Sequence, residues 1–283
     1  MDYLIQPLEY AFMQNALAVA VITATVCGML SAWLVLMGWS LMGEAVAHSV
    51  LPGVVLAFIL GIPFGVGALV FGLLAVALIG GLGQTTALKR DTAIGVVFTS
   101  LFALGLVLIS TVTTSTHLQH ILFGNVLGTS RADLYQVAAL AALTATVLLI
   151  KRRDFTLVAF DRTYALSIGL PVGALTWTLL VLLALTTVTA LQTLGVILVV
   201  AALVIPGATG FLLARSFGPM LGLSAGVGAV AAVVGVYTSY YWDISTGGAI
   251  VLAASSQFLL AYLFSPRRGL LARGVRRLKR RRA

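Results

Sequence analysis

The chain contains a succession of apolar runs, each about 20 residues long, which is the length that an α-helix needs to cross the ~30 Å hydrocarbon core of a bilayer. Backbone N–H and C=O groups have no water to bond inside lipid, so such runs must form helices. The alternation of apolar and polar residues that a membrane β-barrel needs is absent. Hydrophobic residues make up 60% of the 283 positions and charged residues 9%, against about 25% charged residues in a soluble domain. The sequence therefore predicts an all-α fold, a polytopic bundle of transmembrane helices.

Nine apolar runs are predicted to span the membrane. They lie near 13–37, 41–60, 64–83, 92–113, 134–150, 172–191, 194–213, 219–238 and 247–264. The segment between the fourth and fifth runs, Ser115 to Arg131, is too short and too polar to span. If the second run is broken or re-entrant, the number of spans falls to eight.

The net charge of +9 is concentrated at one end of the chain. Nine of the 17 basic residues follow Pro266, and the eight that remain balance the eight acids. We therefore divide the chain into a transmembrane domain, 1–266, and a basic tail, 267–283. Cations beside a membrane helix mark a cytoplasmic end and contact anionic lipid headgroups, so membrane lipid rather than nucleic acid is the expected partner.

Basic residues in the loops predict the orientation, because cytoplasmic loops carry an excess of Lys and Arg. They follow the third, fifth, seventh and ninth runs, at Lys89–Arg90, Lys151–Arg153 with Arg162, Arg215, and the tail. The C-terminus is thus expected in the cytoplasm and, with nine spans, the N-terminus outside. The N-terminal segment has no basic region of the kind that begins a cleaved signal peptide.

The loop from Lys151 to Pro171 is the longest on the predicted cytoplasmic side. Asp161 suits the N-cap of a short helix, Gly169 suits its C-cap, and Pro171 suits the start of the next membrane helix. This loop is either a docking surface for a partner or an ordinary structured connection.

Glu44 and His48 are the two ionisable residues within one predicted span, and such groups are functional candidates because they are costly in lipid. They are four residues apart and project from the same helix face. A carboxylate and an imidazole at that spacing can hold one divalent cation together. Pro52 and Gly53 follow about one turn later and are able to break the helix and free backbone carbonyls.

Three interpretations of this pair remain open. The side chains hydrogen-bond each other as part of the bundle, relay protons, or line a path for a metal ion. Two ligands are too few for a tight site, because zinc takes four and manganese about six, so a second subunit or water must complete the shell.

Other polar residues are predicted to be structural. His117 and His120 have the spacing of metal ligands but no third ligand nearby, and we interpret them as interfacial packing residues. Asp91 is expected to cap the fourth span, Asp243 to lie in an outer loop, and Cys27 to be a buried thiol. No nucleotide-binding loop, catalytic triad or cysteine cluster is present, so the chain has no means of using ATP by itself.

Four motifs in order resemble the membrane permease subunit of bacterial ABC importers for manganese, zinc and ferrous iron. They are SLMGEAVAHSVLPGV (40–54), HILFGNVLG (120–128), FDRTYALSIGLP (160–171) and TLGVILVVAALVIPGATGFLLA (193–214). The resemblance covers the chain up to the tail and is strongest to the manganese-type branch. That family usually has Asp where this chain has Glu44, whose side chain reaches one methylene further.

The resemblance implies a multi-pass permease of the bacterial inner membrane that is not itself an enzyme. It would pass a metal ion, most readily manganese, by Glu44 and His48. It holds no permanent cofactor. Its implied partners are a second permease copy, identical or related, an extracytoplasmic metal-binding protein and a separate ABC ATPase. The ATPase would contact the cytoplasmic coupling segment through Asp161, Arg162, Tyr164, Ala165, Gly169 and Leu170.

The alternative function is a stand-alone secondary carrier coupled to metal or protons. Such a carrier needs ionisable residues on several spans to hold its coupling ion, and here they gather on one. A membrane-embedded metalloprotease would need HExxH or an equivalent motif, which the sequence does not contain.

Overall fold

The computed structural model describes residues 6–85, 89–111, 128–265 and 269–270. Its elements, in chain order, are η1 (Gln6–Glu9), α2 (Ala11–Leu36), α3 (Met42–Ser49), α4 (Leu51–Leu60), α5 (Phe64–Thr85), α6 (Arg90–Ser110), α8 (Arg131–Ile150), α9 (Arg152–Phe160), α10 (Arg162–Ser167), α11 (Val172–Leu194), α12 (Val196–Leu213), α13 (Phe217–Trp242) and α14 (Thr246–Phe264). No strand occurs within these ranges, so the predicted all-α fold is confirmed.

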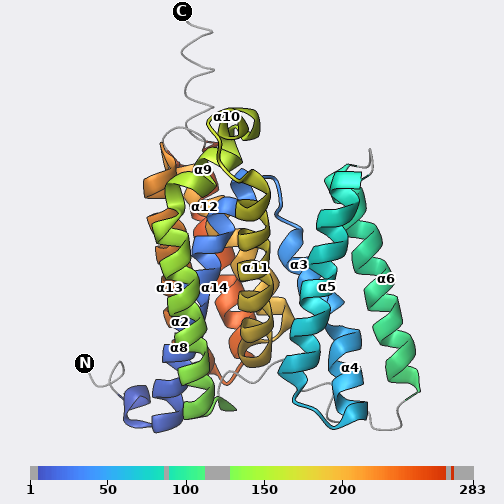
Figure 1. Ribbon diagram of the computed structural model, residues 1–283. Helices are drawn as coiled ribbons and strands as arrows, with labels where there is room; N and C mark the ends of the chain where they lie inside the picture. Colours follow the sequence, from blue (N-terminus) through green and yellow to red (C-terminus); the bar gives the residue numbers. More distant parts are fainter. Residues whose placement is uncertain (1–5, 86–88, 112–127, 266–268, 271–283) are drawn as a thin grey trace, which may run out of the picture.

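The described residues contain nine helical stretches that are long and apolar enough to cross a membrane. One of them, Met42–Leu60, consists of α3 and α4 together. The second predicted span is therefore broken, but its two halves continue in the same direction and the number of spans stays at nine (Figure 1).

Helix α2 lies at the centre of one part of the bundle, where it packs against α8, α11, α12 and α13. A second group, α3 to α6, lies beside it and contacts it chiefly through α11 and α12 (Figure 1). Residues on all sides of α2 are buried, including Met13 and Trp33, as expected for a helix that is apolar all round.

Glycines allow α2 and α13 to approach closely. A Cβ on Gly28 would overlap the backbone carbonyl of Ser224, and a Cβ on Gly228 would overlap that of Ala24. Small residues at a helix crossing let two backbones meet in this way within a membrane. Gly28 and Gly228 therefore set the close approach of the two helices.

A serine from α2 compensates for a proline inside α12. Pro206 has no N–H, and its ring disturbs the helical hydrogen bonds around it. The Ser31 hydroxyl accepts a hydrogen bond from Gly207 N–H at 2.9 Å and donates one to the Val204 carbonyl at 3.2 Å. These two hydrogen bonds join α2 to α12 at the turn where Pro206 interrupts the backbone hydrogen bonding of α12.

The loop from Lys151 to Pro171 forms two helices, of which the sequence predicted one. Asp161 caps α10 as expected, with its Oδ1 accepting from Tyr164 N–H at 2.8 Å, and Gly169 follows the helix with a φ of 81°. Helix α9 was not predicted. It is held by tertiary packing, since buried Phe155 meets the Trp33 ring edge-on with centroids 6.1 Å apart.

One cap prediction was wrong. Helix α6 begins at Arg90 with Lys89 as its N-cap, which places Asp91 in the first turn instead of at the cap. A carboxylate in that turn still interacts favourably with the positive, N-terminal end of the helix dipole.

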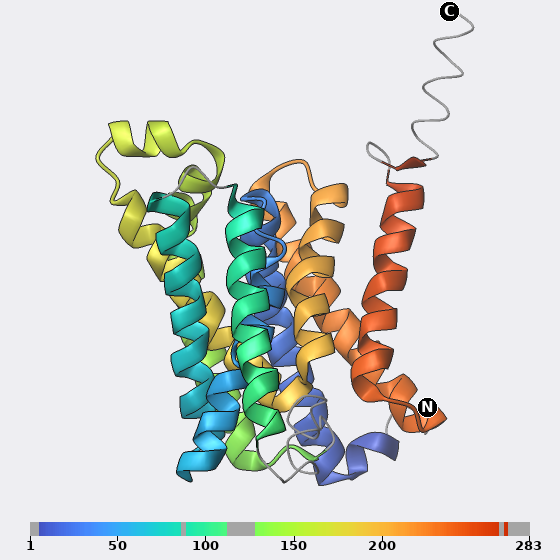
Figure 2. The same ribbon diagram turned by 90° about the vertical axis from the view of Figure 1, so that its right-hand side faces the viewer.

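The basic loops gather at one end of the bundle. The upper end in Figures 1 and 2 holds α9 and α10, the start of α6 after Lys89, the connection containing Arg215 and the end of α14. Asp243, which ends α13 with a φ of 49°, lies at the opposite end together with η1. The charge asymmetry on which the predicted orientation depends is therefore present in the fold.

Candidate metal site on the broken span

Helix α3 carries Glu44 in its first turn and His48 in its last turn. The helix ends at Ser49, and α4 starts at Leu51, so the break is centred on Val50. Pro52 has no N–H to offer to the His48 carbonyl four residues earlier. The predicted break is confirmed, and the His48 carbonyl accepts from the Val50 N–H instead of from a donor four residues later.

Gly53 has a different role from the one the sequence suggested. A Cβ on Gly53 would overlap the carbonyl of Gly67 on α5, and a Cβ on Gly67 would overlap that of Gly53. Gly53 therefore allows α4 and α5 to touch backbone to backbone. This contact fixes the lower half of the broken span against its neighbour.

The His48 ring packs against two phenylalanines of α6. Its centroid lies 5.4 Å from that of Phe98 and 5.4 Å from that of Phe102, with the second contact edge-on. The two phenylalanine rings stack on each other at 5.9 Å. The half-buried imidazole is thus oriented by an aromatic wall that contains no hydrogen-bonding group.

The Glu44 carboxylate is half-buried, and no hydrogen bond or ion pair to it is found among the described residues. In particular, no hydrogen bond joins it to His48 in this part of the chain. The interpretation in which the two side chains simply satisfy each other is therefore not what the structure displays. A carboxylate in this position keeps its oxygens available for a cation.

The pair lies on the side of α3 that faces α6. On α3, Gly43 packs on Leu203 of α12 and Val46 faces Gly72 of α5. At 100° per residue, Glu44 and His48 both point away from Val46 and therefore away from α5. Figure 2 views the bundle from the side of α6, which lies in front of α3.

The described residues contain no cluster of three or more His, Cys, Asp or Glu side chains that could hold a metal ion. Glu44 and His48 are thus two donors from one chain. His117 and His120 lie outside the described residues, as does most of the 120–128 motif. Cys27 is fully buried in α2, as predicted.

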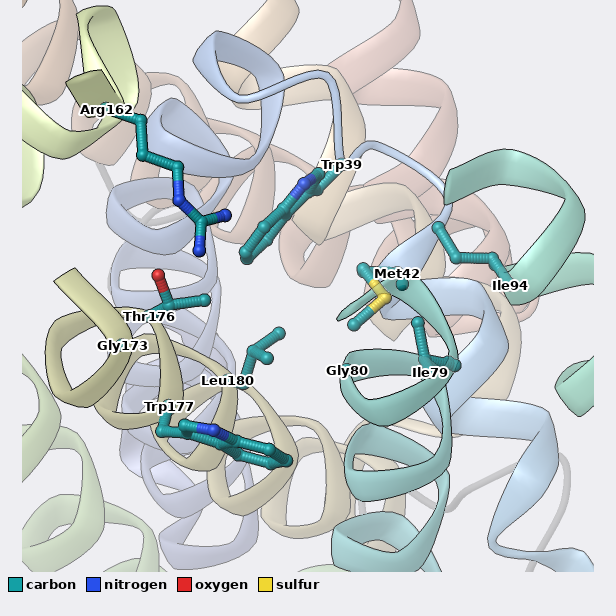
Figure 3. A pocket seen from close by; sticks show the side chains of 11 residues that line it. Trp39, Met42, Ile79, Gly80, Ile94, Arg162, Gly173, Thr176, Trp177 and Leu180 are labelled. Carbon is teal, nitrogen blue, oxygen red and sulfur yellow. The ribbon is translucent and has the colours of Figure 1, made fainter. Parts of the chain in front are cut away.

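A separate pocket of about 60 Å³ lies behind α3, at the end that carries α9 and α10 (Figure 3). Trp39 comes from the connection between α2 and α3, Met42 from the start of α3 and Trp177 from α11. The Arg162 guanidinium enters from α10. Met42 lies two residues, or 200°, from Glu44, so this pocket is on the other face of the helix. Its lining contains no carboxylate, imidazole or thiol, and it is not a metal site.

The residues proposed for coupling gather around α10. Ala165 is fully buried and anchors the helix, while Arg162 reaches the pocket beside Trp39. Three large apolar side chains of this segment are exposed by more than half, at Tyr164, Leu166 and Ile168. The sequence did not single out Leu166, Ile168 or the aromatic wall of α6, because a leucine or phenylalanine in an apolar run carries no distinguishing signal.

Comparison with known proteins agrees with this architecture. The ABC 3 transport family matches residues 9–265. The manganese transport system membrane protein MntB of Synechocystis is 46% identical over 275 residues, which cover 97% of this chain and 90% of that protein. The chelated iron transport system membrane protein YfeD of Yersinia pestis is 48% identical over 92% of this chain and 88% of its own length.

A solved structure supports the same assignment. PsaBC from Streptococcus pneumoniae, in complex with a Fab, is 40% identical and superposes with a TM-score of 0.84 over 94% of this chain and 96% of that one. These relatives are membrane subunits of transport systems and not enzymes in themselves, and no comparison supports a stand-alone carrier. The chain is therefore a multi-pass membrane permease subunit that belongs to the ABC 3 transport family.

Proposed function

We propose that this chain is the permease of an ATP-driven importer of divalent transition metal ions, with manganese as the first candidate and zinc or ferrous iron as the others. The observation that carries the proposal is the half-buried Glu44–His48 pair on a broken membrane helix, with the carboxylate unpaired in the described chain. One oxygen and one imidazole donor, without thiolate, suit manganese. Relatives named for manganese and for iron transport support the class of ion.

Two copies of the permease, identical or related, are proposed to face each other across the side that carries this pair. Manganese prefers about six ligands, and each chain offers two side chains here. A second copy with the same face would double the donor set and leave room for water. Incomplete coordination also favours release, because an ion that is to be transported must not be held tightly.

Coupling to a separate ABC ATPase is proposed to occur through α10 and the residues that follow it, up to Leu170. This segment projects from the end of the bundle and exposes Tyr164, Leu166 and Ile168. Arg162 lies with Trp39 in the pocket that adjoins the start of α3. Movement of α10 thereby has a direct physical route to the helix that carries Glu44 and His48.

The opposite end of the bundle is proposed to receive the ion from an extracytoplasmic binding protein. In this orientation the basic end, with Lys151 and Arg215, faces the cytoplasm and Asp243 faces outward. Transport then consists of coordination and release alone, with no covalent change in the ion.

The test is radiolabelled Mn²⁺ uptake into proteoliposomes that contain the permease, its ATPase and its binding protein. His48→Ala removes one of the two side-chain donors and is expected to lower uptake at least about tenfold, with membrane insertion unchanged. Asp243→Asn is the control, since it removes a carboxylate at the outer end of α13. Normal uptake by the His48 variant would refute the proposed ion path.

A further inference from the structure

A basic groove lies where α9 passes the start of α13, and it takes no part in the proposed ion path. The groove has a volume of about 350 Å³. Its lining consists of Arg152, Arg153, Thr156, Leu157 and Phe160 from α9 and Phe217 and Gly218 from α13. We call it the α9–α13 groove.

The groove is held in shape by a buried tryptophan. Trp33 of α2 is fully buried, and its ring lies 6.1 Å from Phe155 of α9 and 4.9 Å from Phe217 of α13, centroid to centroid. Both walls are thus packed on the same side chain. The site is preformed and does not depend on a loop closing over it.

The groove has an uncompensated positive charge. Asp154 is the nearest acid in sequence, and its carboxylate pairs with Lys151 at 3.5 Å. Arg152 and Arg153 are exposed, and no ion pair to either side chain is found among the described residues. No carboxylate lines the groove, so two guanidinium groups face it without a counter-ion.

The groove lies at the level where the apolar spans end. Helix α8 ends at Ile150, whose side chain is 73% exposed, immediately before the basic residues. Helix α13 begins at Phe217, in the groove itself. Phe160, which is 66% exposed, adds an apolar surface beside the arginines. Guanidinium groups above apolar side chains at the border of a bilayer match a phosphate above acyl chains.

We propose that the α9–α13 groove binds the headgroup of an anionic phospholipid, with its phosphate between Arg152 and Arg153 and the first part of its acyl chains against Phe160 and Leu157. Binding there would brace the connection between α8 and α10 against the membrane. The site is independent of the transported ion. Its failure would therefore leave the proposed transport function untouched.

The test uses phosphatidylglycerol that carries a photoreactive group beside its headgroup, incorporated with the full-length chain into phosphatidylcholine nanodiscs. Labelled peptides are mapped after irradiation, so that contacts with the basic tail are scored separately. The double variant Arg152→Gln, Arg153→Gln is expected to lower labelling of the α9 peptide about tenfold or more. Lys89→Gln is the control, because it removes an exposed cation at the same end but outside the groove.

Competition identifies the ligand. Unlabelled phosphatidylglycerol is expected to suppress labelling of the α9 peptide, whereas phosphatidylcholine and inorganic phosphate are expected to have little effect. Arg153→Lys keeps the charge and is expected to retain most of the labelling, which guards against a folding defect in the double variant. Unchanged labelling in the double variant, or equal competition by phosphatidylcholine, would overturn the proposal. Suppression of labelling by inorganic phosphate would show that the groove binds a free anion, and suppression by the ATPase alone would show that it binds the ATPase. Either result would also overturn the proposal.

Discussion

Glu44 and His48 differ in how the protein holds them. His48 is packed against Phe98 and Phe102, whereas the Glu44 carboxylate has no hydrogen-bond or ion-pair partner in the described chain. A charged side chain within a membrane span is costly and is usually paired or functional. Apart from the nearby His48 imidazole, the fold offers this carboxylate no partner among the described residues, which leaves its oxygens free for a ligand.

Two substitutions of Glu44 separate the effect of its charge from the effect of its side-chain length. Glu44→Gln removes the charge and is expected to lower metal uptake at least about tenfold, while Glu44→Asp keeps it and is expected to reduce uptake less than about threefold. Uptake of Mn²⁺, Zn²⁺ and Fe²⁺ by the reconstituted transporter measures both effects. Because the aspartate is one methylene shorter, the relative rates for the three ions should also change. Equal losses in the two variants would mean that the charge is not what the site requires.

At this scale the sequence identified the site but not its surroundings. Two ionisable residues four apart in an apolar run are visible without a structure, because their cost in lipid makes them exceptional. Nothing in the sequence distinguishes Phe98 and Phe102 from the other apolar residues of a span. Which of them meets His48 depends on how α6 packs against α3, and that is decided by tertiary contacts.

Among the elements, the broken span and the pair α9–α10 are the two departures from a simple bundle. The break at Val50 was predictable, since Pro52 cannot donate to the helix. Helix α9 was not, because its sequence is polar at the start and its position is set by Phe155 against Trp33. Local sequence predicts caps and breaks well, and it predicts poorly the elements that are held by distant partners.

The exposed face of α10 allows a test of the proposed ATPase contact. Leu166→Asp places a charge on a side chain that is 58% exposed, and it is expected to weaken association with the ATPase about tenfold or more without affecting metal binding. Co-purification and ATP hydrolysis by the complex measure the effect. Ile244→Asp is the matched control at the opposite end, where the side chain is 44% exposed. ATPase association that survives the Leu166 change would exclude α10 as the docking surface.

For the molecule as a whole, the nine candidate spans of the described residues put the start of α2 and the end of α14 at opposite ends of the bundle. Lys and Arg in the loops predicted this arrangement, and the fold brings Lys89, Lys151 and Arg215 to one end. The tail from 271 onward lies outside the described residues, so its expected contact with anionic lipid stays a prediction.

Cysteine labelling tests the orientation directly. The chain has one cysteine, Cys27, which is fully buried and provides a low background. With Ser167→Cys, a membrane-impermeant maleimide is expected to react only after the membrane is opened, whereas with Ile244→Cys it should react from outside intact spheroplasts. Reaction of both positions from the same side would require an even number of crossings between them and would contradict the topology.

We propose above all that two permease copies, identical or related, hold the transported ion between the Glu44–His48 pair of this chain and its counterpart in the other copy. The most direct measurement is anomalous X-ray scattering at the manganese edge from crystals of the assembled transporter soaked in Mn²⁺. One peak is predicted for each pair of permease copies, in contact with Glu44 and His48, and absent from His48→Ala crystals. A peak coordinated by other residues, or one of undiminished height in the His48 variant, would contradict the account.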